Sequence, residues 1–170
     1  VLDTALMGTS RQLSAFQQPR REQMDIALAA LERVGIAQLA QRNFAHLSGG
    51  EQQLVLIARA VAQQSDTLIM DEPTSALDYG NQLRVLQQVK ELSREGYTVL
   101  LSTHNPQHAL TFADRVLALR DGTVEAFGAA ESVLTPELIE RLYGVEVTMT
   151  DTPAGSVIIP LTGAKSEHER

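Results

Sequence analysis

The chain has no cysteine among its 170 residues, which excludes disulfide bonds and metal sites with thiolate ligands. Basic residues are also scarce: 14 Lys and Arg stand against 21 Asp and Glu, giving a net charge of −7 at pH 7. Proteins that bind nucleic acid usually present a basic face, so we expect no nucleic-acid partner. No apolar run approaches the ~20 residues that span a bilayer, and we expect any membrane contact to go through a partner protein.

The sequence also lacks the glycine-rich loop that cradles nucleotide phosphates, because no G-x-x-x-x-G-K-[ST] pattern occurs in it. The chain opens at Val1 without a methionine and runs directly into an apolar stretch. We therefore expect this sequence to be a fragment whose natural start lies upstream.

Two helices are expected in the first part of the chain. Four apolar residues recur at helical spacing: Met24, Leu28, Leu31 and Val34. They predict a surface helix with one buried stripe that ends at Gly35. From Gly50 to Gln63 apolar residues occur on nearly every face, which predicts a helix packed on several sides.

The length of the chain and a hydrophobic share of 44% suit one domain, or one and a fraction.

Two short apolar runs, Thr67 to Met70 and Tyr97 to Leu101, are typical of buried parallel strands. An amphipathic helix is expected between them, with Val85, Val89 and Leu92 on its buried stripe. Asn105 and Pro106 suit the start of a short helix after the second strand.

The last third of the chain is expected to contain a hairpin and several short elements. Asp121-Gly122 is a strong signal for a hairpin turn. The expected strands are 115–119, 123–127, 145–149 and 157–159, and the expected short helices are 130–134 and 136–142. Residues 162–170 are polar and are expected to be disordered.

The alternation of helix and strand predicts an α/β fold with parallel strands. In open sheets of this kind, sites form beyond the carboxyl ends of the strands. Asp71 and Glu72 follow the first strand and His104 follows the second. We therefore expect these three residues to share one site.

Asp71 and Glu72 are adjacent, so strand geometry aims their carboxylates in different directions. A carboxylate at a strand end can hold Mg²⁺ through water. The next carboxylate could orient or deprotonate an attacking water. The alternative is that Asp71-Glu72-Pro73 only ends a strand and starts a turn.

Ser48, Gly49 and Gly50 precede the long helix, whose first N–H groups and dipole favour an anion. The alternative for these three residues is an ordinary helix cap. His104 could donate a hydrogen bond to a terminal phosphate. It could instead be a metal ligand together with His108, although Pro106 starts a helix between the two and no third ligand follows. A third alternative is that His104 is a structural residue.

Three runs together resemble the ABC-type ATPase family: LSGGEQQ at residues 47–53, LIMDEPTSALD at 68–78 and STH at 102–104. The resemblance implies that Asp71 is the magnesium residue of the Walker B motif, Glu72 the catalytic base and His104 the switch histidine. It places Ser48, Gly49, Gly50 and Glu51 in the nucleotide-binding signature motif. It also makes Asp78, at the end of the D-loop 75–78, a nucleotide-binding candidate.

The fold implied by this resemblance is a P-loop NTPase-like parallel sheet with a helical subdomain, lacking the amino-terminal β-subdomain and the P-loop. Residues 1–161 would be a partial ATPase domain. Within it, 9–45 would lie in the helical subdomain that docks on a permease, and 46–161 would carry the signature, Walker B, D-loop and switch.

The family also implies cofactors and partners. Two copies would clamp ATP and Mg²⁺ head to tail, bound to a membrane permease and, indirectly, a substrate-binding protein, on the cytoplasmic face of the membrane. The segments 3–8, 134–138 and 143–145 resemble ATPases of importers for iron chelates, haem and cobalamin.

Since no phosphate loop occurs in it, we expect the isolated chain to bind ATP poorly and to hydrolyse it little. Two alternatives remain: a non-catalytic interaction module, and an ABC ATPase without a transport function. The Gln17-Gln18 pair lacks the context of the family's Q-loop.

Overall fold

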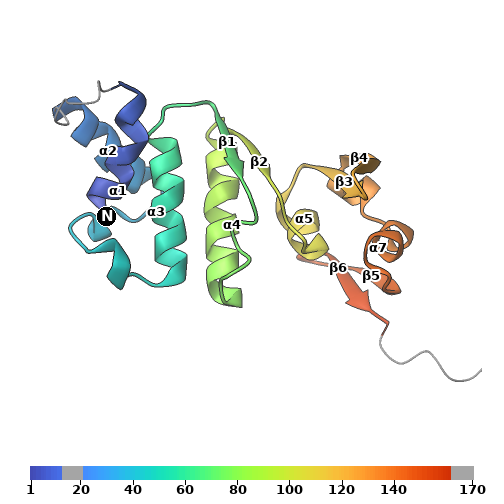
Figure 1. Cartoon of the computed structure of the whole chain (residues 1–170). Helices are drawn as coiled ribbons and strands as arrows, with labels where there is room; N and C mark the ends of the chain where they lie inside the picture. The colour runs from blue at the N-terminus through green and yellow to red at the C-terminus, as the bar shows by residue number, and fades with distance from the viewer. Residues whose placement is uncertain (13–20, 162–170) are drawn as a thin grey trace, which may run out of the picture. The chain divides into compact units, whose positions relative to one another are not determined.

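A computed structural model of the protein describes residues 1–12 and 21–161 (Figure 1). The chain divides into two compact units, one from Val1 to Ser102 and one beginning at Thr103. The expected disordered tail, 162–170, and the Gln17-Gln18 pair lie outside the described residues. Among the described helices, none has both the length and the apolar character needed to cross a membrane.

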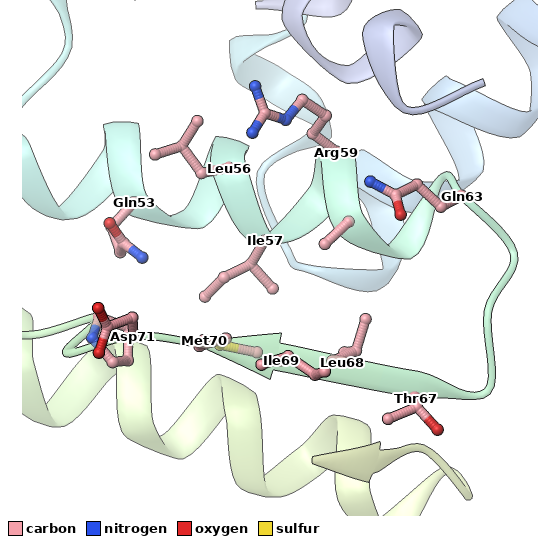
Figure 2. A pocket seen from close by; sticks show the side chains of 12 residues that line it. Gln53, Leu56, Ile57, Arg59, Gln63, Thr67, Leu68, Ile69, Met70 and Asp71 are labelled. Atoms are coloured by element: carbon pink, nitrogen blue, oxygen red, sulfur yellow. The ribbon is translucent and has the colours of Figure 1, made fainter. Parts of the chain in front are cut away.

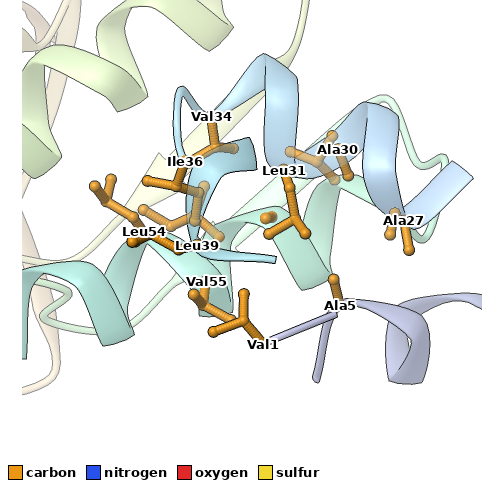
Figure 3. Close-up of a cluster of buried hydrophobic side chains, with 14 of the residues drawn as sticks. Val1, Ala5, Ala27, Ala30, Leu31, Val34, Ile36, Leu39, Leu54 and Val55 are labelled. Carbon is orange, nitrogen blue, oxygen red and sulfur yellow. The ribbon is translucent and has the colours of Figure 1, made fainter. Parts of the chain in front are cut away.

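The first unit begins with a cluster of helices around a common apolar core. Its helical elements are α1 (Leu2–Leu6), η1 (Met7–Gln12), α2 (Arg21–Arg33), η2 (Ala37–Leu39), η3 (Phe44–His46) and α3 (Gly49–Val61). Helices α1, α2 and α3 pack against one another, as the blue to teal ribbons of Figure 1 show. Figure 3 shows the core between them, where Leu31 and Val55 have no exposed surface.

The expected helix around Leu31 is confirmed as α2, and the chain leaves it at Gly35, whose φ of +75° suits glycine. Its buried stripe is only partly the one expected. Met24 and Leu28 remain 40% and 39% exposed, whereas Ala27 and Ala30 are buried. Small alanine side chains let α2 approach α1 and α3 closely, so the packed face is shifted around the helix from the larger side chains.

The expected strand–helix–strand segment is confirmed. Strand β1 (Thr67–Met70) pairs in parallel with β2 (Thr98–Leu101), in the register Met70 opposite Leu101. Between them runs α4 (Tyr79–Arg94), which buries its stripe of Val85, Leu86, Val89 and Leu92. α4 packs against α3 and β2, so this pair of strands is tied to the signature-bearing helix within one unit.

The expectation that both strands are buried is correct for one face only. Leu68 is buried, whereas the neighbouring pair Ile69 and Leu100 is 76% and 59% exposed. Parallel strands are usually covered on both faces. In the described part of the chain, one face of this sheet is therefore apolar and open.

The second unit contains the expected short elements, with strand ends that differ by a few residues. They are α5 (Pro106–Phe112), β3 (Arg115–Arg120), β4 (Thr123–Ala129), α6 (Ala130–Val133), α7 (Pro136–Tyr143), β5 (Val147–Thr152) and β6 (Gly155–Pro160). β3 pairs with β4 and β5 with β6 as antiparallel hairpins. Asp121 and Gly122 both have positive φ, as the predicted tight turn requires.

Gln107 joins α5 to the last hairpin. Its side-chain amide donates to the carbonyl oxygen of Ser156 at 3.2 Å and accepts from the N–H of Ile158 at 2.9 Å. These bonds imitate strand pairing along the edge of β6. The helix that follows His104 is thereby fixed to the carboxyl-terminal hairpin.

Candidate functional site

The signature turn is a complete capping box at the start of α3. The Ser48 hydroxyl accepts from the N–H of Glu51 at 3.4 Å, and Oε2 of Glu51 accepts from the N–H and the hydroxyl of Ser48, both at 2.8 Å. The N–H bond and then the hydroxyl bond from Ser48 hold the pKa of the Glu51 carboxyl below its usual value. Glu51 therefore stays ionised and orients Ser48.

This capping role is the one that the structure shows for Glu51, and nucleotide contact by Glu51 stays a prediction. The first N–H groups of a helix have no acceptor inside it, and the dipole makes that end positive. Ser48 thus stands at a positive helix end, with the orientation of its hydroxyl fixed by a neighbouring carboxylate.

The two signature glycines are where α3 approaches Leu77, in the loop before α4, and Asn81, in the first turn of α4. A Cβ atom on Gly49 would lie 3.2 Å from Cδ2 of Leu77, and one on Gly50 would lie 2.9 Å from Cβ of Asn81. Asn81 leaves room only for glycine at position 50, whereas a Cβ atom at position 49 would require a small shift of the Leu77 side chain. The structure therefore brings the expected signature and D-loop residues into contact within one unit.

Asp78 is the N-cap of α4. Its Oδ1 accepts from the N–H of Asn81 at 2.9 Å, and its Oδ2 accepts from the Asn81 side-chain amide at 2.7 Å. These bonds, the first of them most strongly, lower the pKa of the Asp78 carboxyl. The same Asn81 contacts Gly50, so the cap of α4 and the start of α3 share one side chain.

Two glutamines hold the loops before these two caps. Gln52, four residues after Ser48, donates to the carbonyl oxygens of Phe44 and Leu47 at 3.2 and 3.3 Å. Gln82, four residues after Asp78, does the same to Thr74 and Leu77 at 3.3 and 2.9 Å. The signature turn and the D-loop are thus fixed by the same device.

Asp71 and Glu72 lie at the carboxyl end of β1, as expected, and Ser102 joins them. Its hydroxyl donates to Oδ1 of Asp71 at 2.5 Å and accepts from the N–H of Glu72 at 2.9 Å. Glu72 has a φ of +42°, which is uncommon for a residue with a side chain. Its carbonyl oxygen accepts from the N–H and the hydroxyl of Ser75 at 3.2 and 3.1 Å.

The donor set fits Mg²⁺ bound with most of its water. Within residues 1–12 and 21–161, no three His, Cys, Asp or Glu residues gather closely enough to enclose a metal ion. Mg²⁺ usually needs only one or two carboxylates and keeps several waters. Asp71 is exposed, and because Ser102 bonds to its Oδ1, Oδ2 is left for such a ligand.

An open cavity of about 390 Å³ runs between α3 and β1. Figure 2 shows Gln53 and Asp71 at one end of it and Gln63 and Thr67 at the other, with Ile57 pointing from α3 toward the strand. Asp71 is therefore reachable from a space large enough to admit part of a ligand or a further segment of chain.

His104 belongs to the second unit, and its switch role stays a prediction. It is exposed, whereas His108, one turn into α5, is buried. Burial first, and the charge of His104 second, lower the pKa of His108. Nδ1 of His108 has no hydrogen-bond partner in the part of the chain that the structure describes. A shared metal site is not supported, since no third ligand gathers there among the described residues.

Comparison with known proteins agrees with this arrangement. The family model for ABC transporters matches residues 4–75. An ABC transporter ATP-binding protein of Haemophilus influenzae is 47% identical over 143 residues, which cover 84% of this chain and 54% of that protein. The solved structure of an ABC transporter described as metal-chelate type, in an inward-facing conformation, matches with a TM-score of 0.85 at 33% identity. The chain belongs to the ABC transporter ATP-binding family.

The likeness to that transporter covers 94% of this chain and 65% of the other, and it confirms the predicted α/β, P-loop NTPase-like fold. A ferric enterobactin transport ATP-binding protein of Escherichia coli is 38% identical over 149 residues, covering 86% of this chain and 55% of that protein. The ABC chain described here thus spans about half the length of the curated relatives it matches.

Sequence reasoning missed several residues that position the ABC motifs. Asn81, Gln52 and Gln82 carried a usable signal, since each lies three or four residues after an N-cap candidate. Ser102 carried none, because its contact with Asp71 depends on how two strands 31 residues apart are paired.

Proposed function

We propose that the whole protein binds and hydrolyses ATP and that this hydrolysis powers an importer. The observation that carries the proposal is the group of Asp71, Ser102 and Glu72 at the carboxyl end of β1. It lies in the same compact unit as the Ser48 cap of α3. One carboxylate for a metal, one for water and one positive helix end for phosphate are the parts that phosphoryl transfer needs.

Asp71, Glu72 and His104 have three different roles in the proposed reaction. Asp71 holds Mg²⁺ through water, and the ion, when bound, neutralises charge on the ATP phosphates. Glu72, the next residue along the chain, orients and deprotonates the water that attacks the terminal phosphate. His104 donates a hydrogen bond to that phosphate.

Ser48 and the start of α3 face the terminal phosphate of an ATP molecule held by a second copy of the protein. Asp78 and the rest of the D-loop lie beside this contact, since Gly49 and Gly50 pack on Leu77 and Asn81. The two copies therefore close over two nucleotides, each completing the site of the other.

Metal chelates are the proposed cargo. The relatives include ATP-binding proteins named for import of ferric enterobactin and, in Deinococcus radiodurans, of hemin, the latter 41% identical over 158 residues. The proposed partners are a membrane permease and, through it, a substrate-binding protein, with this protein on the cytoplasmic face.

A single substitution in the whole protein, assembled with its permease, tests the catalytic assignment. Glu72→Gln keeps the size of the side chain and removes its ability to accept a proton. ATP turnover should fall by about 100-fold or more, the size of a general-base contribution, while ATP binding is kept. Glu140→Gln, an exposed carboxylate on α7 outside the segment expected to dock on the permease, is the matched control. Near-normal turnover in Glu72→Gln would remove Glu72 from this role.

A second candidate is a non-catalytic module that binds a permease or a second copy without hydrolysing ATP. Turnover in the wild-type whole protein decides between the two, since the module would show none under any condition.

A further inference from the structure

Ser102 makes hydrogen bonds to both members of the Asp71-Glu72 pair through one oxygen atom. The hydroxyl hydrogen is given to Oδ1 of Asp71, and the oxygen accepts the N–H of Glu72. The N–H of Ser102 also donates to the carbonyl oxygen of Met70 at 3.0 Å, which continues the pairing of β1 and β2. The hydroxyl is thus anchored at the end of β1, where it contacts the Asp71 carboxylate and the backbone N–H of Glu72.

We infer that Ser102 is a positioning residue for the proposed ATPase reaction, holding Asp71 for the metal and Glu72 for the attacking water. The inference rests on the proposed function. Ser102 touches neither reacting atom in this scheme and acts through the two carboxylates.

The Ser102 hydroxyl fixes the orientation of the Asp71 carboxylate. A carboxylate on an exposed strand end can rotate, and a strong donor on Oδ1 fixes the plane of the group. Oδ2 then keeps one direction for the hydrated Mg²⁺. Without the hydroxyl, the carboxylate has to be ordered by the metal itself, so a higher Mg²⁺ concentration is needed for the same occupancy.

The same hydroxyl holds the backbone of Glu72. A positive φ is costly for a residue with a side chain and persists only where neighbouring groups hold it. Ser102 holds the N–H of Glu72 and Ser75 holds its carbonyl oxygen, so the peptide is clamped on both sides. Losing the first bond frees the backbone to relax and moves the base away from the water.

Only a hydroxyl group meets both demands, because the same atom must donate to a carboxylate and accept from an N–H. Threonine can replace serine in this respect, whereas alanine and valine cannot. Threonine and valine have nearly the same shape, so the comparison of Ser102→Thr with Ser102→Val isolates the hydroxyl from the effect of side-chain size.

The test uses the whole protein with its permease and three readouts. The first is kcat for ATP. The second, made in the Glu72→Gln background where slow turnover is expected, is the free Mg²⁺ concentration at which ATP drives half of the protein into the dimer. The third is thermal unfolding of each variant, which reports folding.

Ser102→Ala and Ser102→Val should lower kcat by about tenfold to a hundredfold, the effect of losing a hydrogen bond to a charged group. Each should also raise the Mg²⁺ requirement severalfold. Ser102→Thr should keep both values within about threefold of wild type. If Ser102→Ala does not fold, the comparison of Ser102→Thr with Ser102→Val still tests whether the hydroxyl is needed.

Unchanged kcat and Mg²⁺ requirement in Ser102→Val, or equal losses in Ser102→Thr and Ser102→Val, would overturn the inference. A lower melting temperature in Ser102→Val with neither value changed would also overturn it, since the hydroxyl would then serve folding alone. Failure of the proposed function looks different, because the wild-type protein itself would show no turnover and no ATP-driven dimer.

Discussion

Gly50→Ala should loosen the contact between the signature turn and the first turn of α4. The added Cβ atom would lie 2.9 Å from Cβ and 2.6 Å from Cγ of Asn81, and it would also overlap Oδ1 of that residue. Carbon atoms in contact normally lie about 3.5–4.0 Å apart, so the overlap with Cβ is about 0.6 Å. The tip of Asn81 can rotate away, but its Cβ moves only with the backbone of α4. Helices α3 and α4 must therefore separate.

The magnitude follows from two opposing effects. Overpacking of this kind costs about 1–3 kcal/mol. Replacing glycine by alanine inside a helix returns up to about 1 kcal/mol. Gly80→Ala provides the matched control, because Gly80 is also the second residue of its helix and an added Cβ would meet only Oδ1 of Asp78, at 3.6 Å. The difference between the two variants should be about 1–3 kcal/mol.

Urea unfolding of the 170-residue chain, followed by the helix signal in circular dichroism, measures this difference. Gly50→Ala should unfold at lower urea than wild type and Gly80→Ala at the same or higher urea. Adding Asn81→Gly, which removes the Cβ atom that the new alanine meets, should recover part of the loss relative to Asn81→Gly alone. Equal midpoints for Gly50→Ala and Gly80→Ala would refute the proposed close contact.

Two further predictions concern the second unit. The pKa of His108 is lowered from its usual value of 6.5, so just below that pH the unfolded chain binds more protons than the folded chain. The contribution of His108 to the free energy of unfolding should therefore be fully present above pH 6.5 and should be lost as the pH falls below it. His108→Gln should flatten the dependence of the urea midpoint on pH below 6.5. An unchanged slope would argue against His108 as the titrating group. Gln107→Ala removes two hydrogen bonds to β6 and should destabilise the hairpin by about 1–3 kcal/mol. Hydrogen exchange at the Ile158 amide should then be faster. Unchanged exchange at that amide would contradict the role of Gln107.

The elements that sequence reasoning found are those decided by local pattern. The stripe of Val85, Val89 and Leu92 lies on one side of α4, and β1 has the predicted bounds, because side-chain period and chain direction determine both. The Asp121-Gly122 turn was predicted for the same reason, since its positive φ values favour those residue types.

What could not be predicted depends on long-range packing. Met24 and Leu28 look like core residues by size and spacing, but close packing on α1 and α3 buries Ala27 and Ala30 in their place. Ser102 reaches Asp71 only because β2 is in parallel register with β1. Of the candidate site residues, Ser48 to Glu51, Asp71, Glu72 and Asp78 lie in the first unit, and His104 lies in the second.

We propose that each nucleotide lies between two copies of the protein, with Ser48 of one copy facing ATP held by the other. Sedimentation of the whole protein carrying Glu72→Gln, with ATP and Mg²⁺, tests this arrangement. We expect a dimer that requires ATP and that is lost when Ser48→Arg is added, because arginine fills the space of the phosphate. Equally tight ATP binding by a monomer, with or without Ser48→Arg, would rule this arrangement out.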